Sequence, residues 1–402
     1  MMRYVIIGAS AAGLAAAESI RQWDPRGAIT LISDEPHPPY SRPLLTYLLS
    51  GEVSLEKIWL KSADYFEKWG FEVLLGERVV QVAAGEREVR LQSGRVCPYD
   101  RLLISSGARP RLPGVPGEDL EGVFTLRTLA DWRRLDAALP EGGEVAVVGA
   151  GPVGLKAAEA LSHRGCRVAL VEMESQVLPR LVDAQAAAML EGELKKWGID
   201  VYCNAAPRGI VEVKGQVQAL ALADGRELPA QVVLFAIGVT PNTEFLGNTG
   251  LAAAGGIPVN PRLETGQPDI FAAGDCVQGV NLLTGQPAYV PIWPAAVEQG
   301  KIAGANMAGA DRRYPGALPQ NSISLRGFKI ITGGLAHPEA EDVEITSELD
   351  RHRGQYRRLV YREGRLVGLT LVGAVADAGI YFQLMSQQLP AIEPMTPGRL
   401  WG

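Results

Sequence analysis

Two segments of the chain share one pattern: a short apolar strand, a glycine-rich turn and then a helix. The first segment begins at Tyr4 and the second at Val145, and further apolar strands follow at 28–32 and 167–171. A short apolar run that is bounded by glycine and followed by helix formers indicates a strand, a turn and a helix. Each segment is therefore interpreted as a β-α-β unit, and such units build parallel sheets with helices on their faces. The pattern predicts an α/β fold with two Rossmann-like domains.

The second turn, residues 149–154, has the glycine spacing of a dinucleotide-binding loop. Gly149 permits the tight turn, Gly151 lets backbone N–H groups approach a pyrophosphate, and Gly154 lets the helix pack close to the strand. The N-terminus of the helix adds partial positive charge, which favours a phosphate group. The predicted binding residues of this turn are Gly149, Gly151, Pro152, Val153 and Gly154. The alternative interpretation is a structural glycine turn that binds no nucleotide.

An acidic residue, Glu172, follows the next strand of this second segment. A carboxylate at this position accepts hydrogen bonds from the adenosine ribose and repels a 2′-phosphate. The residue after it is Met173, not an arginine that would hold such a phosphate. The sequence therefore favours NADH over NADPH.

The first turn, residues 8–13, has Ser10 where the second glycine of the spacing would stand. A small residue still lets phosphates approach, but the match is less specific by itself. Asp34 and Glu35 follow the next strand, where a carboxylate can accept hydrogen bonds from a ribose. The alternative for this acidic pair is a solvated turn. The companions of the turn nevertheless predict a second dinucleotide site.

Charge and composition exclude several other classes of protein. The formal net charge is −6, and Lys and Arg do not cluster as binding to nucleic acid would require. The basic stretch 351–358 is interpreted as a solvated loop or hairpin. No secretory signal and no long apolar run is visible, so we expect a cytoplasmic protein without a membrane span. Four cysteines and four histidines are scattered, and their spacing predicts no metal site.

The order of strands and helices predicts three regions. Residues 1–120 and 246–312 are expected to form one discontinuous domain around the first turn, and residues 121–245 a second domain around the other turn. From 315 to 402 the pattern changes to strands and a terminal helix, which predicts a small C-terminal α+β domain.

The chain resembles the two-dinucleotide flavoprotein reductases of the pyridine nucleotide–disulfide oxidoreductase superfamily. The matching motifs lie, in the order of the family, at 5–13, 102–110, 145–154, 236–242 and 270–276. The resemblance covers residues 1–312 strongly and the remainder loosely. It implies a fold of the glutathione-reductase type, with FAD bound by the first domain and NAD(H) by the second.

The resemblance also implies roles for individual residues. It places the pyrophosphate of FAD at the first turn, its ribose at the acidic pair and its ribityl chain at Asp275. Arg42 is implied to neutralise the phosphates, and charge-assisted pairs of this kind are strong. The implied FAD set is Gly8, Ser10, Ala12, Gly13, Asp34, Glu35, Arg42, Val80 through its backbone, Arg109, Asp275 and Trp293. The NAD set adds Glu172 and Gly238 to the second turn.

Two departures from the superfamily bear on the reaction. Its disulfide reductases carry a redox cysteine in the helix after the first β-α-β unit, but residues 36–70 contain no cysteine. A thiol–disulfide relay needs a thiolate, so disulfide reduction is not expected. Ferredoxin-reductase-like members have a flavin-contacting lysine where this chain has Tyr47, and its role, flavin contact or packing, stays open. This helix resembles instead the flavoprotein part of nitrite reductases and the NADH:rubredoxin reductases.

The resemblance implies hydride transfer from NADH to FAD, which needs no acid or base, so no catalytic side chain is predicted. The expected electron acceptor is a small redox protein, such as rubredoxin or ferredoxin, or an iron–sulfur subunit. The alternative is a stand-alone NADH oxidase that reduces oxygen, and a nucleotide-sensing binding module is a third hypothesis. Region 315–402 is expected to line either a homodimer interface or the acceptor site.

Overall fold

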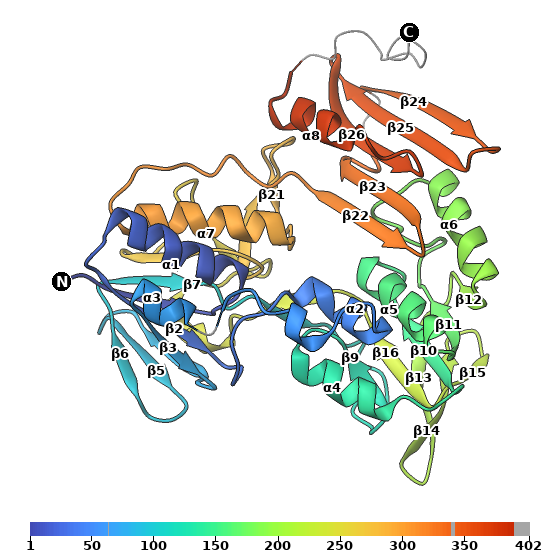
Figure 1. Ribbon diagram of the computed structural model, residues 1–402, viewed down its shortest axis with the longest axis horizontal. Helices are drawn as coiled ribbons and strands as arrows, with labels where there is room; N and C mark the ends of the chain where they lie inside the picture. Colours follow the sequence, from blue (N-terminus) through green and yellow to red (C-terminus); the bar gives the residue numbers. More distant parts are fainter. Residues whose placement is uncertain (63, 339–341, 390–402) are drawn as a thin grey trace. The chain divides into compact units, whose positions relative to one another are not determined.

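The computed structural model of the protein describes residues 1–62, 64–338 and 342–389 (Figure 1). The chain divides into two compact units, each assembled from separated stretches of sequence. The first unit contains Met1–Ser41, Leu55–Arg109 and Val239–Ala317, and the second contains Arg42–Ser54, Pro110–Gly238 and Leu318–Gly402. The last part of the predicted C-terminal domain, 390–402, lies outside the described residues.

A five-stranded parallel sheet forms the centre of the first unit. Strand β1 (Arg3–Ile7) lies between β2 (Ala28–Ser33) and β7 (Arg101–Ile104), and β3 (Phe71–Leu75) and β19 (Ile270–Ala272) form the edges. In the register of this sheet, Ile7 pairs with Ile32 on one side and with Ile104 on the other. The chain therefore leaves β1 toward one neighbour and later returns on the opposite side. The carboxyl end of such a strand is the place where open α/β sheets bind their ligands.

Helices α1 (Ala11–Trp23) and α7 (Trp293–Met307) lie side by side on the sheet of the first unit (Figure 1). Two glycines of α7 permit this packing. A Cβ atom at Gly300 would lie 2.2 Å from the carbonyl oxygen of Ala12, and one at Gly304 would lie 2.4 Å from that of Ala16. Non-bonded atoms do not approach so closely. The two helices therefore touch through their backbones.

Shorter elements complete the first unit. A three-stranded antiparallel sheet follows β3 in the chain and precedes β7. Its strands are β4 (Val79–Ala83), β5 (Glu88–Leu91) and β6 (Val96–Pro98). The other elements are η2 (Leu55–Lys57), α3 (Tyr65–Trp69), β8 (Ala108–Pro110), β17 (Val239–Pro241), η3 (Glu244–Thr249), β18 (Ile257–Pro258), β20 (Val277–Val280) and β21 (Pro287–Ala288).

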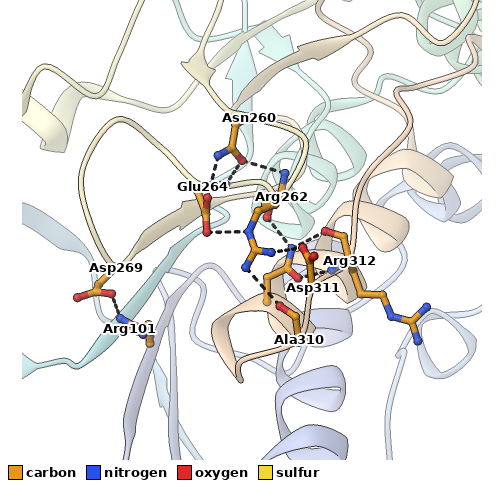
Figure 2. Close-up of polar contacts among 9 residues, drawn as sticks. Arg101, Asn260, Arg262, Glu264, Asp269, Ala310, Asp311 and Arg312 are labelled. Atoms are coloured by element: carbon orange, nitrogen blue, oxygen red, sulfur yellow. Dashed lines mark hydrogen bonds and ion pairs between the residues drawn. The ribbon is translucent and has the colours of Figure 1, made fainter.

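A polar cluster fixes the loop around Arg262 against the end of α7 (Figure 2). Arg262 Nε lies 3.0 Å from Glu264 Oε1, and Nη1 of the same guanidinium pairs with Asp311. The buried side chain of Asn306, on α7, donates to the carbonyl oxygens of Arg262 and Arg312, each at 2.8 Å. The partly exposed ion pairs contribute little because water screens them. The amide of Asn306 contributes more, because it is itself buried and hydrogen-bonded.

A second five-stranded parallel sheet forms the centre of the second unit. Strand β10 (Glu144–Val148) lies between β11 (Arg167–Val171) and β16 (Val232–Phe235), and β12 (Ile199–Tyr202) and β9 (Val123–Thr125) form the edges. The sheet repeats the order of four strands of the first sheet, but its edge strand next to β16 comes from before β10 in the chain, whereas the edge strand next to β7 comes from after β7. Here too an antiparallel sheet precedes the last inner strand, formed by β13 (Pro207–Val213), β14 (Gln216–Leu222) and β15 (Glu227–Pro229). The carboxyl end of β10 is therefore a second ligand-binding position of the same kind.

The helices of the second unit begin at recognisable residues. A capping box between Thr128 and Asp131 starts α4 (Leu129–Ala138). Asp183 starts α6 (Ala184–Lys196), because its carboxylate accepts the N–H groups of Gln185 and Ala186 at 2.9 and 3.2 Å. No helix is predicted here from the sequence, although Asp183 precedes an alanine-rich run. The other helices before the C-terminal sheet are η1 (Arg42–Leu44), α2 (Leu45–Ser50) and α5 (Pro152–His163), and α2 packs against α5 (Figure 1).

The C-terminal part of the second unit is an antiparallel sheet with one helix. Its strands are β22 (Gln320–Leu325), β23 (Phe328–Gly334), β24 (Val343–Asp350), β25 (Gln355–Arg362) and β26 (Arg365–Val372), and its helix is α8 (Ala378–Ser386). The basic stretch 351–358 forms the turn between β24 and β25 and enters β25, so it is part of a hairpin, as predicted. Its last residue, Arg358, is not solvated, because its side chain is largely buried beside Asp183. Ile323 and Leu325 belong to the same buried cluster as Leu155 and Leu161 of α5. This sheet therefore shares a hydrophobic core with the second parallel sheet.

The predicted α/β class and both predicted β-α-β units are confirmed. Within the described ranges of the chain, no helix has both the length and the apolar character that crossing a membrane would require.

Candidate functional site

The first turn joins β1 to α1, and its two glycines are required by the protein's own packing. Gly8 has a φ of +101°, and a Cβ atom there would lie 2.2 Å from the carbonyl oxygen of Ser105. A Cβ atom at Gly13 would lie 1.9 Å from the carbonyl oxygen of Gly8. Ser10 is the extended residue before α1, and in the described part of the chain its hydroxyl caps none of the first N–H groups of that helix. Those N–H groups carry the partial positive charge of the helix N-terminus.

The second turn repeats this geometry between β10 and α5. Gly149 has a φ of +103°, and a Cβ atom at Gly154 would lie 1.8 Å from the carbonyl oxygen of Gly149. Gly151 differs, because a Cβ atom there would have no described atom within 4 Å. Pro152 begins the helix, where its missing N–H costs nothing, and the side chain of Val153 is exposed. The absent side chain of Gly151 therefore leaves open space in front of the helix N-terminus.

Glu172 is buried at the base of the second turn, with 9% of its surface exposed. Its Oε2 accepts the N–H of Ala150 at 2.7 Å, and its Oε1 accepts the N–H of Glu174 at 3.0 Å. Two backbone hydrogen bonds therefore fix the carboxylate directly behind the glycine loop. Each carboxylate oxygen has further capacity to accept a hydrogen bond.

The acidic residues of the first unit stand at a different position from Glu172. The N–H of Gly149 donates to Val171 O, and the N–H of Gly8 donates to Ile32 O, at 2.7 and 2.8 Å. The residue that corresponds to Glu172 is therefore Ser33, and the two acids follow it. The sequence alone does not reveal this offset, because it depends on the register of β2 against the turn.

Glu35 is oriented by side chains that follow it in the chain, whereas Asp34 is exposed. Tyr40 donates its hydroxyl to Glu35 Oε2 at 2.8 Å, and His37 Nε2 lies 3.5 Å from the same oxygen. The rings of His37, Tyr40 and Trp59 meet edge to face. This aromatic cluster explains why the proline-rich stretch after β2 has a definite structure.

The loop after β19 brings Asp275 to the start of α1. Gly274 has a φ of +84°, and a Cβ atom there would lie 3.1 Å from Cβ of Ala12. The N–H of Gly274 donates to Oε1 of Gln299 at 2.7 Å, and Tyr289 donates its hydroxyl to the carbonyl oxygen of Asp275 at 3.0 Å. The structure thus brings the predicted residues of the first turn together with Asp275. Gln299 and Tyr289 are not among the predicted residues.

Trp293 is the first residue of α7 and is half-buried against the cluster that contains Ala12 and Ala296. Val80 lies on β4 with its side chain exposed, at the register shift between Val79 and Gln81 in the pairing of β4 with β5. Arg109 is ion-paired with Glu244 and donates to the carbonyl oxygen of Pro241 at 3.2 Å. These residues also belong to the first unit.

Two further predicted residues of the second unit, Arg42 and Gly238, lie outside its glycine turn. Arg42 begins η1, and its guanidinium donates to the carbonyl oxygen of Arg127 at 3.0 Å. Gly238 has a φ of +99° and accepts the N–H of Arg111 on its carbonyl oxygen at 2.9 Å. Gly238 lies three residues beyond β16, whose neighbour in the sheet is β10. It therefore belongs to the same edge of the sheet as the second turn.

Tyr47, whose role was left open, receives a cation on its ring. The ammonium group of Lys156, on α5, lies 4.2 Å from the ring centre. The same ammonium group contacts Glu159 Oε2 at 2.9 Å and donates to the carbonyl oxygen of Ser324 at 3.0 Å. Cation–π contacts of this kind stabilise a structure by about 0.5–2 kcal/mol. Tyr47, on α2, therefore packs against α5.

The cysteines have the properties of packing residues. Cys276 is fully buried, donates to the carbonyl oxygens of Ile104 and Ala273, and has its pKa raised by burial to about 11. Burial also raises the pKa of Cys203 to about 11, and the pKa values of Cys97 and Cys166 are raised for the same reason. Reactive cysteines have lowered pKa values. Among the described residues, no three His, Cys, Asp or Glu side chains are grouped to hold a metal ion.

Two parallel sheets, each with a glycine turn at its switch point, are the arrangement of a protein that binds two dinucleotides. The chain belongs to the family described as pyridine nucleotide-disulphide oxidoreductase, whose model matches residues 2–300. Members of this family bind FAD and NAD(P)H, and the chain is an FAD-dependent NAD(P)H oxidoreductase.

Individual relatives extend this result. The chain is 33% identical over 380 residues to the NADH oxidase of Methanocaldococcus jannaschii. The aligned residues cover 92% of this chain and 84% of that protein. It is 29% identical to the assimilatory nitrate reductase electron transfer subunit of Bacillus subtilis, covering 99% of this chain and 52% of the relative. The chain thus spans about half the length of the latter protein.

A solved structure agrees with the fold. The ferredoxin reductase for the CYP199A2 system of Rhodopseudomonas palustris superposes with a TM-score of 0.89 at 28% identity. The match covers 97% of this chain and 96% of that protein. The predicted fold of two Rossmann-like domains is therefore confirmed.

Proposed function

We propose that the chain passes electrons from NADH, through FAD, to a small redox protein such as rubredoxin or ferredoxin, or to an iron–sulfur subunit. The observation that carries this proposal is the combination of two dinucleotide turns with an absence of reactive thiols. Residues 36–70 contain no cysteine, and the four cysteines elsewhere have raised pKa values. Electrons that do not reach a protein disulfide must leave by another acceptor.

The first unit is proposed to hold FAD. Gly8, Ser10, Ala12 and Gly13 would present the N–H groups of the α1 N-terminus to the pyrophosphate, and such a terminus favours anions. Glu35, oriented by Tyr40, is the better placed acid for the ribose. The proposed set of the first unit also contains Asp34, Val80, Arg109, Asp275 and Trp293. Arg42, which lies in the second unit, stays a prediction from the resemblance. The meeting of the first turn with the Asp275 loop supports this assignment, because one cofactor would contact both.

The second unit is proposed to hold NADH through Gly149, Gly151, Pro152, Val153, Gly154, Glu172 and Gly238. The open space at Gly151 supports this assignment, because the protein's own packing does not require a glycine there. Glu172 has spare capacity for ribose hydroxyl groups and carries a negative charge that disfavours a 2′-phosphate. Bound FAD and NADH supply the redox chemistry, so the protein's task is to orient the two groups and exclude water.

The acceptor is tested by steady-state assays on the purified protein. NADH is expected to support rapid reduction of ferricyanide, rubredoxin or ferredoxin, and not of glutathione disulfide or coenzyme A disulfide. Disulfide turnover at a rate comparable with that of ferricyanide would overturn the proposal. The names of the relatives, an electron transfer subunit and a ferredoxin reductase, support the choice of acceptor.

A stand-alone NADH oxidase is the second candidate, because the 33% identical relative from M. jannaschii bears that name. Oxygen uptake as fast as acceptor reduction would favour the oxidase. Slow oxygen uptake beside fast acceptor reduction favours electron transfer.

The domain limits 1–120 with 246–312, 121–245 and 315–402 stay a prediction, as do the cytoplasmic location and the homodimer. Limited proteolysis, cell fractionation and native mass measurement test them in turn.

A further inference from the structure

Gln299 is a buried polar side chain on α7, on a face of the helix that is largely apolar. Only 5% of its surface is exposed, and its neighbours on the buried face include Ala295, Ala296 and Ala303. A buried amide is costly unless it is hydrogen-bonded. Gln299 meets this requirement through Oε1, which accepts the N–H of Gly274 at 2.7 Å.

That hydrogen bond holds the residue directly before Asp275. Gly274 is in the left-handed region, with a φ of +84°, and its carbonyl oxygen accepts the N–H of Val277 at 3.0 Å. Tyr289 donates to the carbonyl oxygen of Asp275. The backbone of Asp275 is thus held on both sides, by Gln299 through Gly274 and by Tyr289 directly.

The helix that carries Gln299 is also fixed against the first turn. Its neighbour in sequence, Gly300, touches the backbone of Ala12 so closely that a Cβ atom would lie 2.2 Å from the carbonyl oxygen. Gly274 lies close to the side chain of the same residue, since a Cβ atom built on Gly274 would lie 3.1 Å from Cβ of Ala12. Adjacent residues of α7 therefore position both the first turn and the Asp275 loop.

We propose that Gln299 is a positioning residue for FAD, and that it acts by fixing Asp275 through the N–H of Gly274. This inference rests on the proposed FAD site of the first unit. Without the acceptor, the N–H of Gly274 would lose its partner and the Asp275 loop would sample other conformations. FAD would then leave the protein faster, while binding of NADH by the second unit would be unaffected.

The test compares Gln299→Met with Ser19→Ala in the FAD-loaded protein. Methionine has a similar volume but no amide oxygen. Ser19 is a matched control, because its buried hydroxyl donates to Lys301 O at 2.7 Å and so also joins α1 to α7, away from the Asp275 loop. FAD release is followed by flavin fluorescence after dilution, and backbone exchange is followed by hydrogen–deuterium mass spectrometry of a peptide covering 270–277.

Gln299→Met is expected to release FAD about tenfold faster, the ratio expected for one lost buried hydrogen bond, to exchange faster at 270–277, and to keep the KM for NADH. Ser19→Ala is expected to match the unaltered protein in both measurements. Equal FAD release in the two variants, or faster exchange without faster release, would overturn the proposal. If Gln299→Met gives no folded protein, Gln299→Glu replaces it. The carboxyl oxygen of the glutamate can accept the same N–H, so exchange at 270–277 is expected to stay slow, and rapid exchange there would overturn the proposal. Unaltered protein without FAD would instead refute the proposed function.

Discussion

Replacing Gly300 by alanine tests the backbone contact between α1 and α7. The new Cβ atom would lie 2.2 Å from Ala12 O, so the helices must separate by about 1 Å to reach an ordinary contact distance. Overpacking of this kind costs about 1–3 kcal/mol. Alanine also favours the helix by roughly 1 kcal/mol over glycine. We expect the free energy of unfolding to fall by about 1 kcal/mol, because backbone atoms cannot move aside as a flexible side chain can.

The same substitution at Gly192 is the control. Gly192 lies on the exposed side of α6, and a Cβ atom there would have no described neighbour within 4 Å. Gly192→Ala is therefore expected to raise the free energy of unfolding by about 0.5–1 kcal/mol. Chemical denaturation of both variants gives the comparison, and FAD content after gel filtration gives a second measurement. If Gly300→Ala were as stable as Gly192→Ala, the close contact of α1 with α7 would be refuted.

Three further predictions concern charge and thiols. Glu172→Ala is expected to raise the KM for NADH about tenfold, since one or two ribose hydrogen bonds are lost, and to lower the preference for NADH over NADPH; an unchanged ratio of kcat/KM for the two nucleotides would contradict the role of Glu172. Iodoacetamide at pH 7 is expected to leave NADH-dependent acceptor reduction intact, because burial raises the pKa values of Cys203 and Cys276 to about 11 and few thiolates are present. Rapid inactivation that Cys203→Ser or Cys276→Ser prevents would contradict this prediction. Asp100 has its pKa lowered to about 2, chiefly by hydrogen bonds from Arg3, so its stabilisation is present above about pH 4 and is lost as the pH falls toward 2. Asp100→Asn is expected to remove less than about 1 kcal/mol at pH 7, because the pair is solvent-screened, and the difference from the unaltered protein should vanish near pH 2; a difference that persists there in denaturation curves would refute the assignment.

The sequence was sufficient for the two β-α-β units because their information is local. A run such as Val145–Val148, the glycines after it and the helix formers beyond it lie within one continuous stretch, and each follows from a short-range rule. Helix α6 has a local signal too, the N-cap residue Asp183, but no binding motif accompanies it and the helix is not among the predicted elements.

The contacts that complete the candidate site had no local signal. Gly274 meets Gln299 and Ala12 because two helices and a loop pack together, and no short-range pattern encodes that meeting. Ser33, not Asp34, corresponds to Glu172 because of a strand register that sequence spacing does not fix. The partner of Tyr47 is Lys156, which lies on another helix and is not recognisable before the helices are packed.

The contact of Lys156 with Ser324 has a consequence for how this protein can be divided. The C-terminal sheet covers the face of α5 on which Lys156 pairs with the buried Glu159, and it supplies Ile323 and Leu325 to the same core. A shortened chain that ended before β22 would expose this face and leave the ion pair without the carbonyl oxygen of Ser324. Protein engineers who wish to transplant the second parallel sheet with α5 must therefore move the C-terminal sheet with it, or replace the apolar residues on that face of α5 by polar ones.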